Sequence, residues 1–267
     1  MKRFGYIYEK ICDLDNLRDA HKHARKDKLY YREVKMIDKN PDFYLKQIQE
    51  MLINETYEVS PYTVSIINDK GKDRELRKLP YYPDRIIQWA IMLQIEKIFM
   101  DVFISSTCAS LAGRGIHTAS KKIRRYLKED PEGTRYCYKI DVKHFYPSIN
   151  HAMLKKLLRK KFKDTKLLRL LDKIIDSSGG EVGIPIGSYL SQYLANFYLA
   201  YFDHWIKEEL GVKYYVRYMD DIVILHNSKE YLHALHFKIR EYLGSNLQLS
   251  ITVSYTHLRA HETSAHL

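Results

Sequence analysis

The sequence predicts an α+β fold in which short strands alternate with longer helices. Short β-type runs at residues 136–142, 214–218 and 222–225 are bounded by turn residues, as strands are. The longer segments between them carry apolar side chains at helical spacing. A chain of 267 residues that is 45% hydrophobic can bury one large core or two modest ones, so we expect a single enzyme-sized unit with lobes.

Charge and hydropathy narrow the classes of partner. Lysine and arginine outnumber aspartate and glutamate by 44 to 33, a formal net charge of +11, which favours a polyanion such as nucleic acid. No apolar stretch approaches the roughly 20 residues that span a bilayer, and the amino terminus has no apolar signal segment. We therefore expect a cytoplasmic protein without a membrane partner. The three cysteines are too widely spaced for a zinc knuckle or a CxxC pair, which favours reduced core residues.

Residues 1–60 are predicted to form a basic helical region. Leu14, Leu17 and Ala24 recur at helical spacing, and Pro41 begins a second helix that runs to residue 54. The basic cluster at residues 21–26 either contacts phosphates or forms a solvated helix face.

The following segment predicts a β-hairpin. A β-type run at residues 62–67 leads into turn residues at 68–73, and a second strand returns with Arg77. Lys70 and Lys72 lie at its tip. Such a hairpin either binds phosphate groups or is an exposed hairpin that lysine keeps soluble.

The rest of the chain alternates between predicted helices and loops. A loop at residues 110–117 contains Arg114 and Gly115 and allows a phosphate to approach the backbone, although such a loop alone is a weak indicator. Further helices are expected at 86–99, 118–128, 151–176 (one long or two shorter), 191–210 and 229–243, with a last strand at 247–253.

Three acidic residues occupy unusual places in the predicted strands. Asp141 ends one apolar β run, and Asp220 and Asp221 lie at the turn between two others. An ionised acid in an apolar interior costs several kcal/mol unless it is paired or binds a metal. If these strands are neighbours, the carboxylates converge and can hold two Mg²⁺ ions about 3.5–4 Å apart for phosphoryl transfer. The alternative for an isolated Asp-Asp pair is an ordinary β-turn.

The order and spacing of these residues resemble the catalytic motifs of reverse transcriptases. The match consists of Tyr218, Met219, Asp220 and Asp221 between two β runs, with Asp141 upstream. The resemblance implies a right-hand polymerase fold, with a small antiparallel palm sheet packed on helices. It also implies the two Mg²⁺ ions, for which Mn²⁺ is a possible substitute. The implied metal ligands are Asp141, Asp220, Asp221 and the carbonyl of Val142. The implied template and primer contacts at the turn are Tyr218 and Met219.

A glycine-containing loop extends the resemblance and suggests a subfamily. Ile186 and Gly187, followed by Ser191 and Gln192, are similar to the nucleotide-binding loop of reverse transcriptases from diversity-generating retroelements. In group II intron and retroviral relatives the position of Ile186 usually holds a glutamine. We therefore expect Ile186, Gly187 and Gln192 to shape the nucleotide pocket.

Other family positions follow from the same resemblance. Tyr146 matches the aromatic residue that excludes a ribose 2′-hydroxyl, and its alternative is a core aromatic that ends a strand. The implied triphosphate contacts are Lys70, Lys72 and Arg77, and the implied template or primer contacts are Arg114 and Gly115.

The resemblance also implies domains and partners. The fingers would comprise residues 61–85 and 151–187 and the palm 86–150 and 188–253, before an atypical tail at 254–267 and with the thumb absent. The expected partners are an RNA template, a DNA or RNA primer and deoxynucleoside triphosphates, with room for an accessory protein. The expected source is a bacterium or a phage. The alternatives are a retron or phage-defence reverse transcriptase and an inactive RNA-binding fragment.

Overall fold

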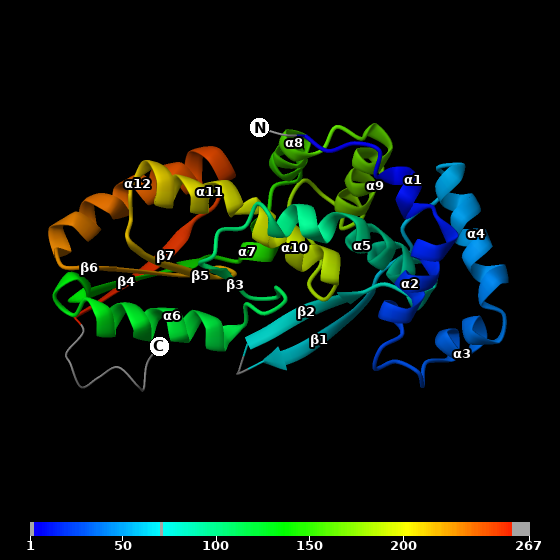
Figure 1. Cartoon of the computed structure of the whole chain (residues 1–267), viewed down its shortest axis with the longest axis horizontal. Coiled ribbons are helices and arrows are strands. Elements are labelled where there is room, and N and C mark those ends of the chain that lie inside the picture. Colours follow the sequence, from blue (N-terminus) through cyan, green and yellow to red (C-terminus); the bar gives the residue numbers. More distant parts are fainter. Residues whose placement is uncertain (1–2, 70–71, 258–267) are drawn as a thin grey trace. The chain divides into compact units, whose positions relative to one another are not determined.

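Helices and one main β-sheet make up the chain, which confirms the predicted mixture of helix and sheet (Figure 1). The computed structural model describes residues 3–69 and 72–257. Two compact units are present, and each is assembled from two separate stretches of sequence. The first comprises Met1–Phe99 and His151–Gln192, and the second comprises Met100–Asn150 and Tyr193–Leu267.

The first unit is mainly helical and contains a two-stranded antiparallel hairpin. Strands β1 (Thr63–Asp69) and β2 (Lys72–Lys78) pair along their whole length, as the turn residues between them predict. The helices are α1 (Tyr8–Ile11), α2 (Leu14–Ala24), α3 (Arg32–Lys39), α4 (Pro41–Ile53), η1 (Tyr81–Arg85), α5 (Ile86–Met100), α8 (His151–Lys161) and α9 (Thr165–Asp176).

The second unit is built on a five-stranded sheet with the order β3-β5-β6-β4-β7. Only the β3–β5 pair is parallel among these described strands. The strands are β3 (Thr107–Cys108), β4 (Tyr136–Val142), β5 (Tyr214–Tyr218), β6 (Asp221–His226) and β7 (Ile251–His257). The helices are α6 (Ile116–Glu129), η2 (Glu132–Thr134), α7 (Phe145–Ser148), α11 (Ala200–His204), η3 (Trp205–Glu209) and α12 (Lys229–Leu247), and α10 (Tyr189–Tyr198) spans the boundary between the units.

Helices cover both faces of this sheet (Figure 1). On one face, Cys137, Val216 and Leu225 pack with Ala119 and Ile123 of α6 in one apolar cluster. Because successive side chains of a strand point to opposite faces, the residues between them turn the other way. On that second face the Tyr138 hydroxyl bonds to Nδ1 of His236 in α12 at 2.9 Å. All three cysteines are free and buried, as predicted.

The end of the chain differs from the expected helix and strand boundaries. Helix α12 continues to Leu247 instead of ending at residue 243, and strand β7 begins at Ile251 instead of residue 247. The physical reason is that Leu235, Ile239, Leu243 and Leu247 are all buried and form one apolar stripe at i, i+4 spacing. The left-handed Gln248, with φ of 54°, then ends the helix.

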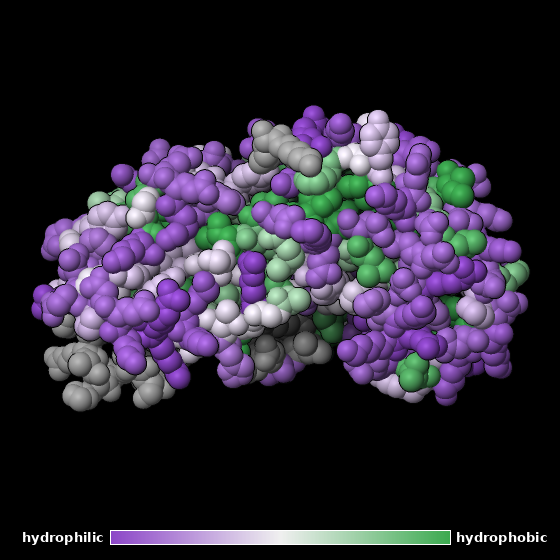
Figure 2. Space-filling model, in the orientation of Figure 1, coloured by the Kyte–Doolittle hydropathy of each residue, from purple (hydrophilic) through white to green (hydrophobic). Residues whose placement is uncertain are grey.

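Other differences are smaller. The segment expected at 191–210 is divided into α10, α11 and the π-helical turn η3, and the segment at 151–176 forms the two shorter helices α8 and α9. Among the described helices, none has the length and apolar character required to cross a bilayer. On the face drawn in Figure 2, hydrophilic residues cover most of the surface.

Asp164 ties the amino-terminal segment to α9. Its Oδ1 accepts from the N–H of Leu167 at 3.2 Å, which caps the helix, and its Oδ2 accepts from the N–H groups of Ile7 and Tyr8 at 2.7 and 2.9 Å. Burial raises the pKa of the Asp164 carboxyl, but these backbone donors outweigh burial and leave the pKa below its usual value.

We expect Asp164→Ala to lower the free energy of unfolding at pH 7 by about 1–2 kcal/mol, the usual effect of losing a helix cap. Because the folded-state pKa is lowered, this stability is present above the ordinary carboxyl pKa and is lost as the pH falls through the folded value. Urea unfolding at pH 7 and pH 3 measures both effects. Asp13→Ala is the matched control. Among the described bonds, the Asp13 carboxylate accepts only from the N–H groups of Asp15 and Asn16, which cap α2. A difference between Asp164→Ala and its parent that did not shrink at acidic pH would contradict this account.

Candidate active site

Two of the predicted acids lie directly opposite each other in the sheet of the second unit. The antiparallel pairing of β4 with β6 makes Asp141 the Cα partner of Asp221. Side chains at directly opposed positions leave the sheet on the same face. The Nζ of Lys139, two residues before Asp141, lies 3.5 Å from Oδ1 of Asp221. The pairing therefore brings two carboxylates and one ammonium group together.

This acidic pair occupies the uncovered end of the α6 face. Along β4 that face runs from the buried Cys137 through Lys139, whose side chain is 50% exposed, to the exposed Asp141. Along β6 it runs from the buried Leu225 to Asp221, whose side chain is 45% exposed. Helix α6 thus buries the apolar end of the face and leaves the carboxylates accessible to a ligand.

The third acid, Asp220, belongs to the turn that joins β5 to β6. Its carbonyl oxygen accepts a hydrogen bond from the N–H of Val142 at 3.3 Å, so the turn is bonded to the residue that follows Asp141. Met219, which precedes it, has a left-handed φ of 56°, a conformation that an unbranched non-glycine residue rarely adopts. The turn is therefore held in one unusual shape beside the acidic pair.

The donor set is suited to magnesium when substrate completes it. In the described part of the chain, no three His, Cys, Asp or Glu side chains form a metal-ligand cluster, so the three predicted carboxylates are not preassembled as one. Mg²⁺ is usually held by one or two carboxylates together with water and substrate phosphates. The opposed Asp141 and Asp221, with Asp220 in the adjoining turn, supply carboxylates of that kind.

Tyr146 lies in α7, close to the turn. Its side chain is half-buried, and its hydroxyl is 3.9 Å from the sulfur of Met219. Burial, and after it the charge of Asp220, raises the pKa of the Tyr146 phenol, so the ring is neutral at physiological pH. A neutral aromatic ring thus stands next to the residue that precedes Asp220.

Arg114 braces its own loop. One guanidinium nitrogen donates to the carbonyl of Ile104 at 3.0 Å, and its carbonyl accepts from the N–H of Ala109. Gly115 is the N-cap residue, directly before the first residue of α6. The template or primer role expected of Arg114 and Gly115 stays a prediction. The bond to Ile104 shows that Arg114 stabilises its own loop.

Gly187 lies in the first unit and requires the freedom of glycine. Its φ is +119°, and a Cβ there would lie 3.0 Å from Cδ1 of Leu76 in β2. The neighbouring Ile186 and Gln192 are both half-buried. Lys70 lies outside the described residues, and for Lys72 only the backbone pairing with Asp69 is described.

We expect Gly187→Ala to destabilise the protein by about 1–3 kcal/mol, because a non-glycine residue at this φ is strained while the end of Leu76 can move. The matched control is Gly244→Ala in α12, where no atom would crowd the new Cβ. A helix-interior glycine is less favourable than alanine by about 0.5–1 kcal/mol, so the control should gain stability. Urea unfolding gives both values. Equal effects of the two substitutions would show that the loop backbone is not strained.

Gly187 also lines a pocket of about 360 Å³ in the first unit. The rings of Trp89 and Tyr189 are stacked in its wall at 4.6 Å between centroids. No aspartate or glutamate is among the described residues that line it, and its cations are Lys28, Arg77, Lys78 and Arg85. Arg77 donates to the carbonyl of Ser178 at 2.7 Å, so part of its guanidinium is used within the protein. Rings and cations together are typical of a nucleic-acid surface.

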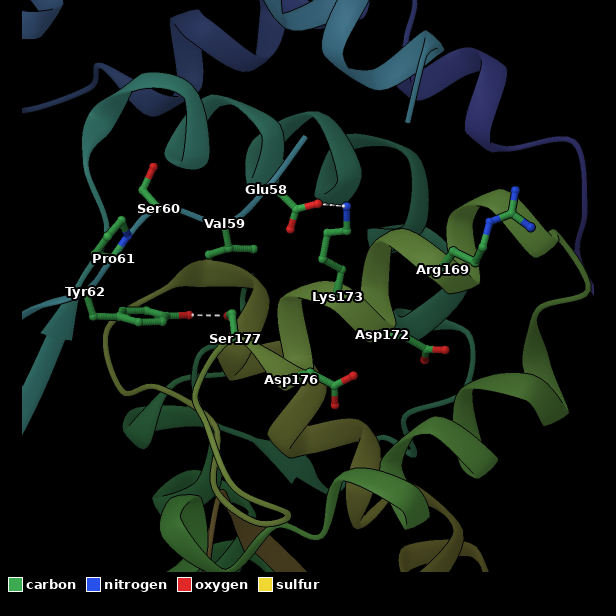
Figure 3. A pocket seen from close by; sticks show the side chains of 10 residues that line it. All are labelled: Glu58, Val59, Ser60, Pro61, Tyr62, Arg169, Asp172, Lys173, Asp176 and Ser177. Atoms are coloured by element: carbon green, nitrogen blue, oxygen red, sulfur yellow. Dashed lines mark hydrogen bonds and ion pairs between the residues drawn. The ribbon is translucent and has the colours of Figure 1, made fainter. Parts of the chain in front are cut away.

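A larger groove of about 760 Å³ in the same unit has a different character (Figure 3). Lys173 reaches across it to Oε1 of Glu58 at 2.6 Å. The hydroxyls of Tyr62 and Ser177 bond to each other at 2.8 Å. The acids Asp172 and Asp176 pair with Arg159 and Lys155 of α8. Its charges are therefore paired within the protein, which indicates a structural role.

One group of residues beneath the turn was not predicted from the sequence. Arg217 of β5 and Asp203 of α11 form an ion pair in which both side chains are fully buried. The signal was present, since Arg217 is a charged residue within an otherwise apolar β run.

Comparison with known proteins shows the family of the chain. Residues 67–262, more than half of the chain, match the family model described as "Reverse transcriptase (RNA-dependent DNA polymerase)". The chain therefore belongs to the reverse transcriptase family. The matched region includes Asp141, Asp220 and Asp221.

Three curated relatives show where the likeness lies. The group II intron-encoded protein LtrA of Lactococcus lactis subsp. cremoris is 30% identical over 172 residues, which cover 61% of this chain and 28% of that protein. Protein YkfC of Escherichia coli (strain K12) is 26% identical over 61% of this chain and 45% of its own length. Nuclear intron maturase 4, mitochondrial, of Arabidopsis thaliana is 27% identical over 76% of this chain and 25% of its own length. The chain thus spans less than half the length of these relatives.

Solved structures show the same fold at low sequence identity. Apo telomerase from Candida tropicalis superposes with a TM-score of 0.55 and 12% identity over 76% of this chain and 45% of that one. Telomerase from Candida albicans, in complex with a fragment of telomeric RNA, has a TM-score of 0.56 and 10% identity over 83% of this chain and 48% of that one. The fold is therefore shared with telomerase.

Proposed function

We propose that this chain is an active RNA-directed DNA polymerase that adds deoxynucleotides to a primer 3′-hydroxyl by two-metal phosphoryl transfer. The observation that carries the proposal is the opposition of Asp141 and Asp221 at the uncovered end of the sheet, beside the turn that contains Asp220. Membership of the reverse transcriptase family supports the reaction class.

The acids would hold two Mg²⁺ ions, with Mn²⁺ as a substitute, together with the carbonyl of Val142. Bound ions of this type activate the attacking hydroxyl and stabilise the leaving group. Asp141 and Asp221 each supply a carboxylate on the open face, and Asp220 supplies the third. Asp141 and Asp221 leave the sheet on the same face, and the negative charge of these acids would attract the cations.

Other residues would bind and select the substrates. Tyr146 would exclude a ribose 2′-hydroxyl by the bulk of its ring, and its half-buried position beside Met219 supports this role. Positive charge attracts the triphosphate and the nucleic-acid backbone. The proposed triphosphate contacts are Lys70, Lys72 and Arg77, the pocket residues are Ile186, Gly187 and Gln192, and the template or primer contacts are Arg114, Gly115, Tyr218 and Met219.

The loop at Ile186 and Gly187 supports an origin in a diversity-generating retroelement. An apolar side chain in place of glutamine removes a polar contact to the nucleotide, which would relax base selection. A retron or phage-defence enzyme is the alternative. Neighbouring genes separate them, since a template repeat and a variable repeat favour the first origin and a structured noncoding RNA favours the second.

The test is extension of a labelled primer on an RNA template with deoxynucleoside triphosphates and Mg²⁺. We expect extension with Mg²⁺ or Mn²⁺, none after chelation by EDTA, and a strong preference for deoxynucleotides. Incorporation that persists in excess EDTA would contradict the proposal.

A second candidate function is RNA binding without polymerisation. It is favoured by the pocket of the first unit, where stacked aromatic rings lie beside cations as on a nucleic-acid surface. Under this alternative the chain binds RNA with the salt dependence of phosphate contacts but extends no primer under any metal condition. The same assay, run beside an RNA-binding titration, therefore separates the two functions.

A further inference from the structure

Beneath the turn, Arg217 and Asp203 form a buried ion pair that is joined by several hydrogen bonds. Arg217 and Asp203 are each 0% exposed, with Nη2 of the arginine 2.6 Å from Oδ2 of the aspartate. The Nε of Arg217 donates to both carboxylate oxygens, at 2.8 and 3.0 Å. Removing two charges from water is unfavourable unless geometry and further hydrogen bonds compensate for it. The role of this pair therefore depends on what else each partner contacts.

Asp203 has a complete set of donors. Besides the guanidinium, its carboxylate accepts from the hydroxyl of Thr107 at 2.8 Å and from the hydroxyl of Tyr215. These bonds join α11 to strands β3 and β5, all within the second unit. On this side the network stabilises the fold and anchors the arginine.

The other side of Arg217 faces the turn. Its Nη1 donates to the carbonyl oxygen of Met219 at 2.9 Å and to Oδ1 of Asn196 at 3.0 Å. The Met219 carbonyl belongs to the peptide unit that joins Met219 to Asp220. The N–H of Met219 donates to the carbonyl of Cys108 at 3.3 Å. The left-handed Met219 is therefore held at both its amide and its carbonyl.

We propose that Arg217 is a positioning residue, whose guanidinium, anchored by Asp203, holds the Met219–Asp220 peptide unit and so sets the direction of the Asp220 carboxylate. This inference rests on the proposed function, in which Asp220 binds a metal ion. Groups that orient metal ligands from behind control affinity without contacting the metal. The unfavourable left-handed turn persists because a buried charge-assisted bond holds it.

The geometry requires arginine. A guanidinium is a planar fork that donates in several directions at once, whereas a lysine ammonium is a single charged point on a flexible stem. Arg217→Lys keeps a positive charge beside Asp203. Its single ammonium group cannot at the same time donate to the Met219 carbonyl and to Asn196. Thr107→Val is the matched control, because it removes a bond to the same carboxylate but keeps the guanidinium that donates to Met219.

The experiment compares the parent, Arg217→Lys and Thr107→Val in three measurements. The first is thermal melting, and the second is the ¹³C-methyl resonance of Met219, assigned through Met219→Leu. The third is Mn²⁺ affinity, followed by electron paramagnetic resonance. We expect both variants to melt at lower temperature than the parent. Only Arg217→Lys should move the Met219 resonance and weaken Mn²⁺ binding, by about tenfold or more.

Two outcomes would overturn the inference. One is an unmoved Met219 resonance and parental Mn²⁺ affinity in Arg217→Lys; the other is equal changes in both variants, which indicate a purely structural pair. If the parent itself binds no Mn²⁺, the proposed metal site fails, while the Met219 resonance still decides the role of Arg217. Should Arg217→Lys not fold, the uncharged double variant Arg217→Met with Asp203→Leu replaces it, since such exchanges are often tolerated. The same shift of the Met219 resonance is expected.

Discussion

Replacing Asp220 with asparagine is expected to lower the rate of primer extension by about 10³-fold or more. The substitution keeps the shape of the side chain but removes a charge that would hold a metal ion. Metal ions contribute several kcal/mol of charge stabilisation to such reactions, and each 1.36 kcal/mol corresponds to about a tenfold change in rate. Single-turnover extension of a primer on an RNA template, with the enzyme in excess, measures the effect directly.

Asp15→Asn provides the control for net charge. The Asp15 side chain is 87% exposed and pairs with Arg18, an interaction of little energetic value at such exposure. It should extend the primer at the parental rate. Equal rates in the parent and in Asp220→Asn would remove Asp220 from the chemistry, whatever the behaviour of the control.

The second large effect is expected at Tyr146. Replacing its ring with the smaller valine side chain should open space for a ribose 2′-hydroxyl and reduce the preference for deoxynucleotides by about 100-fold, the upper range for discrimination by shape alone. Tyr146→Phe keeps the ring and loses only the hydroxyl that approaches the sulfur of Met219 at 3.9 Å. We expect it to discriminate as the parent does.

Competition between a deoxynucleotide and its ribonucleotide in the same extension reaction measures this ratio. If valine and phenylalanine at position 146 behaved alike, Tyr146 would be a packing aromatic without a role in sugar selection. Its half-buried ring belongs to α7, so it does not end a strand as that alternative first supposed.

Local signals account for what the sequence predicted correctly. The strands around Asp141 and Asp221 have the apolar pattern of a half-buried sheet, and their acids interrupt that pattern where side chains become exposed. The hairpin of β1 and β2 follows from turn residues between two β-type runs. Such signals depend on neighbours along the chain and can be read without knowing the fold.

Features that depend on distant contacts could not be predicted. The register that sets Asp141 opposite Asp221 joins residues about 80 positions apart in the sequence, and a slip of one residue would turn either acid to the other face. Leu247 fits an alternating strand as well as a helix, and only its burial beside Leu243 decides between them. Arg217 gives a local signal, but its partners Asp203 and Asn196 are identified only by the fold.

The proposed reaction requires Asp141 and Asp220 to bind the same pair of divalent ions. Fe²⁺ can replace Mg²⁺ in sites of this kind, and with ascorbate and peroxide it generates hydroxyl radicals that cleave the backbone next to the bound ion. We predict cleavage near residue 141 and near residue 220 in the same protein, with both cuts lost in Asp141→Asn. Cleavage near one of the two positions only, or two cuts that survive in Asp141→Asn, would contradict the binding of the same ions by Asp141 and Asp220.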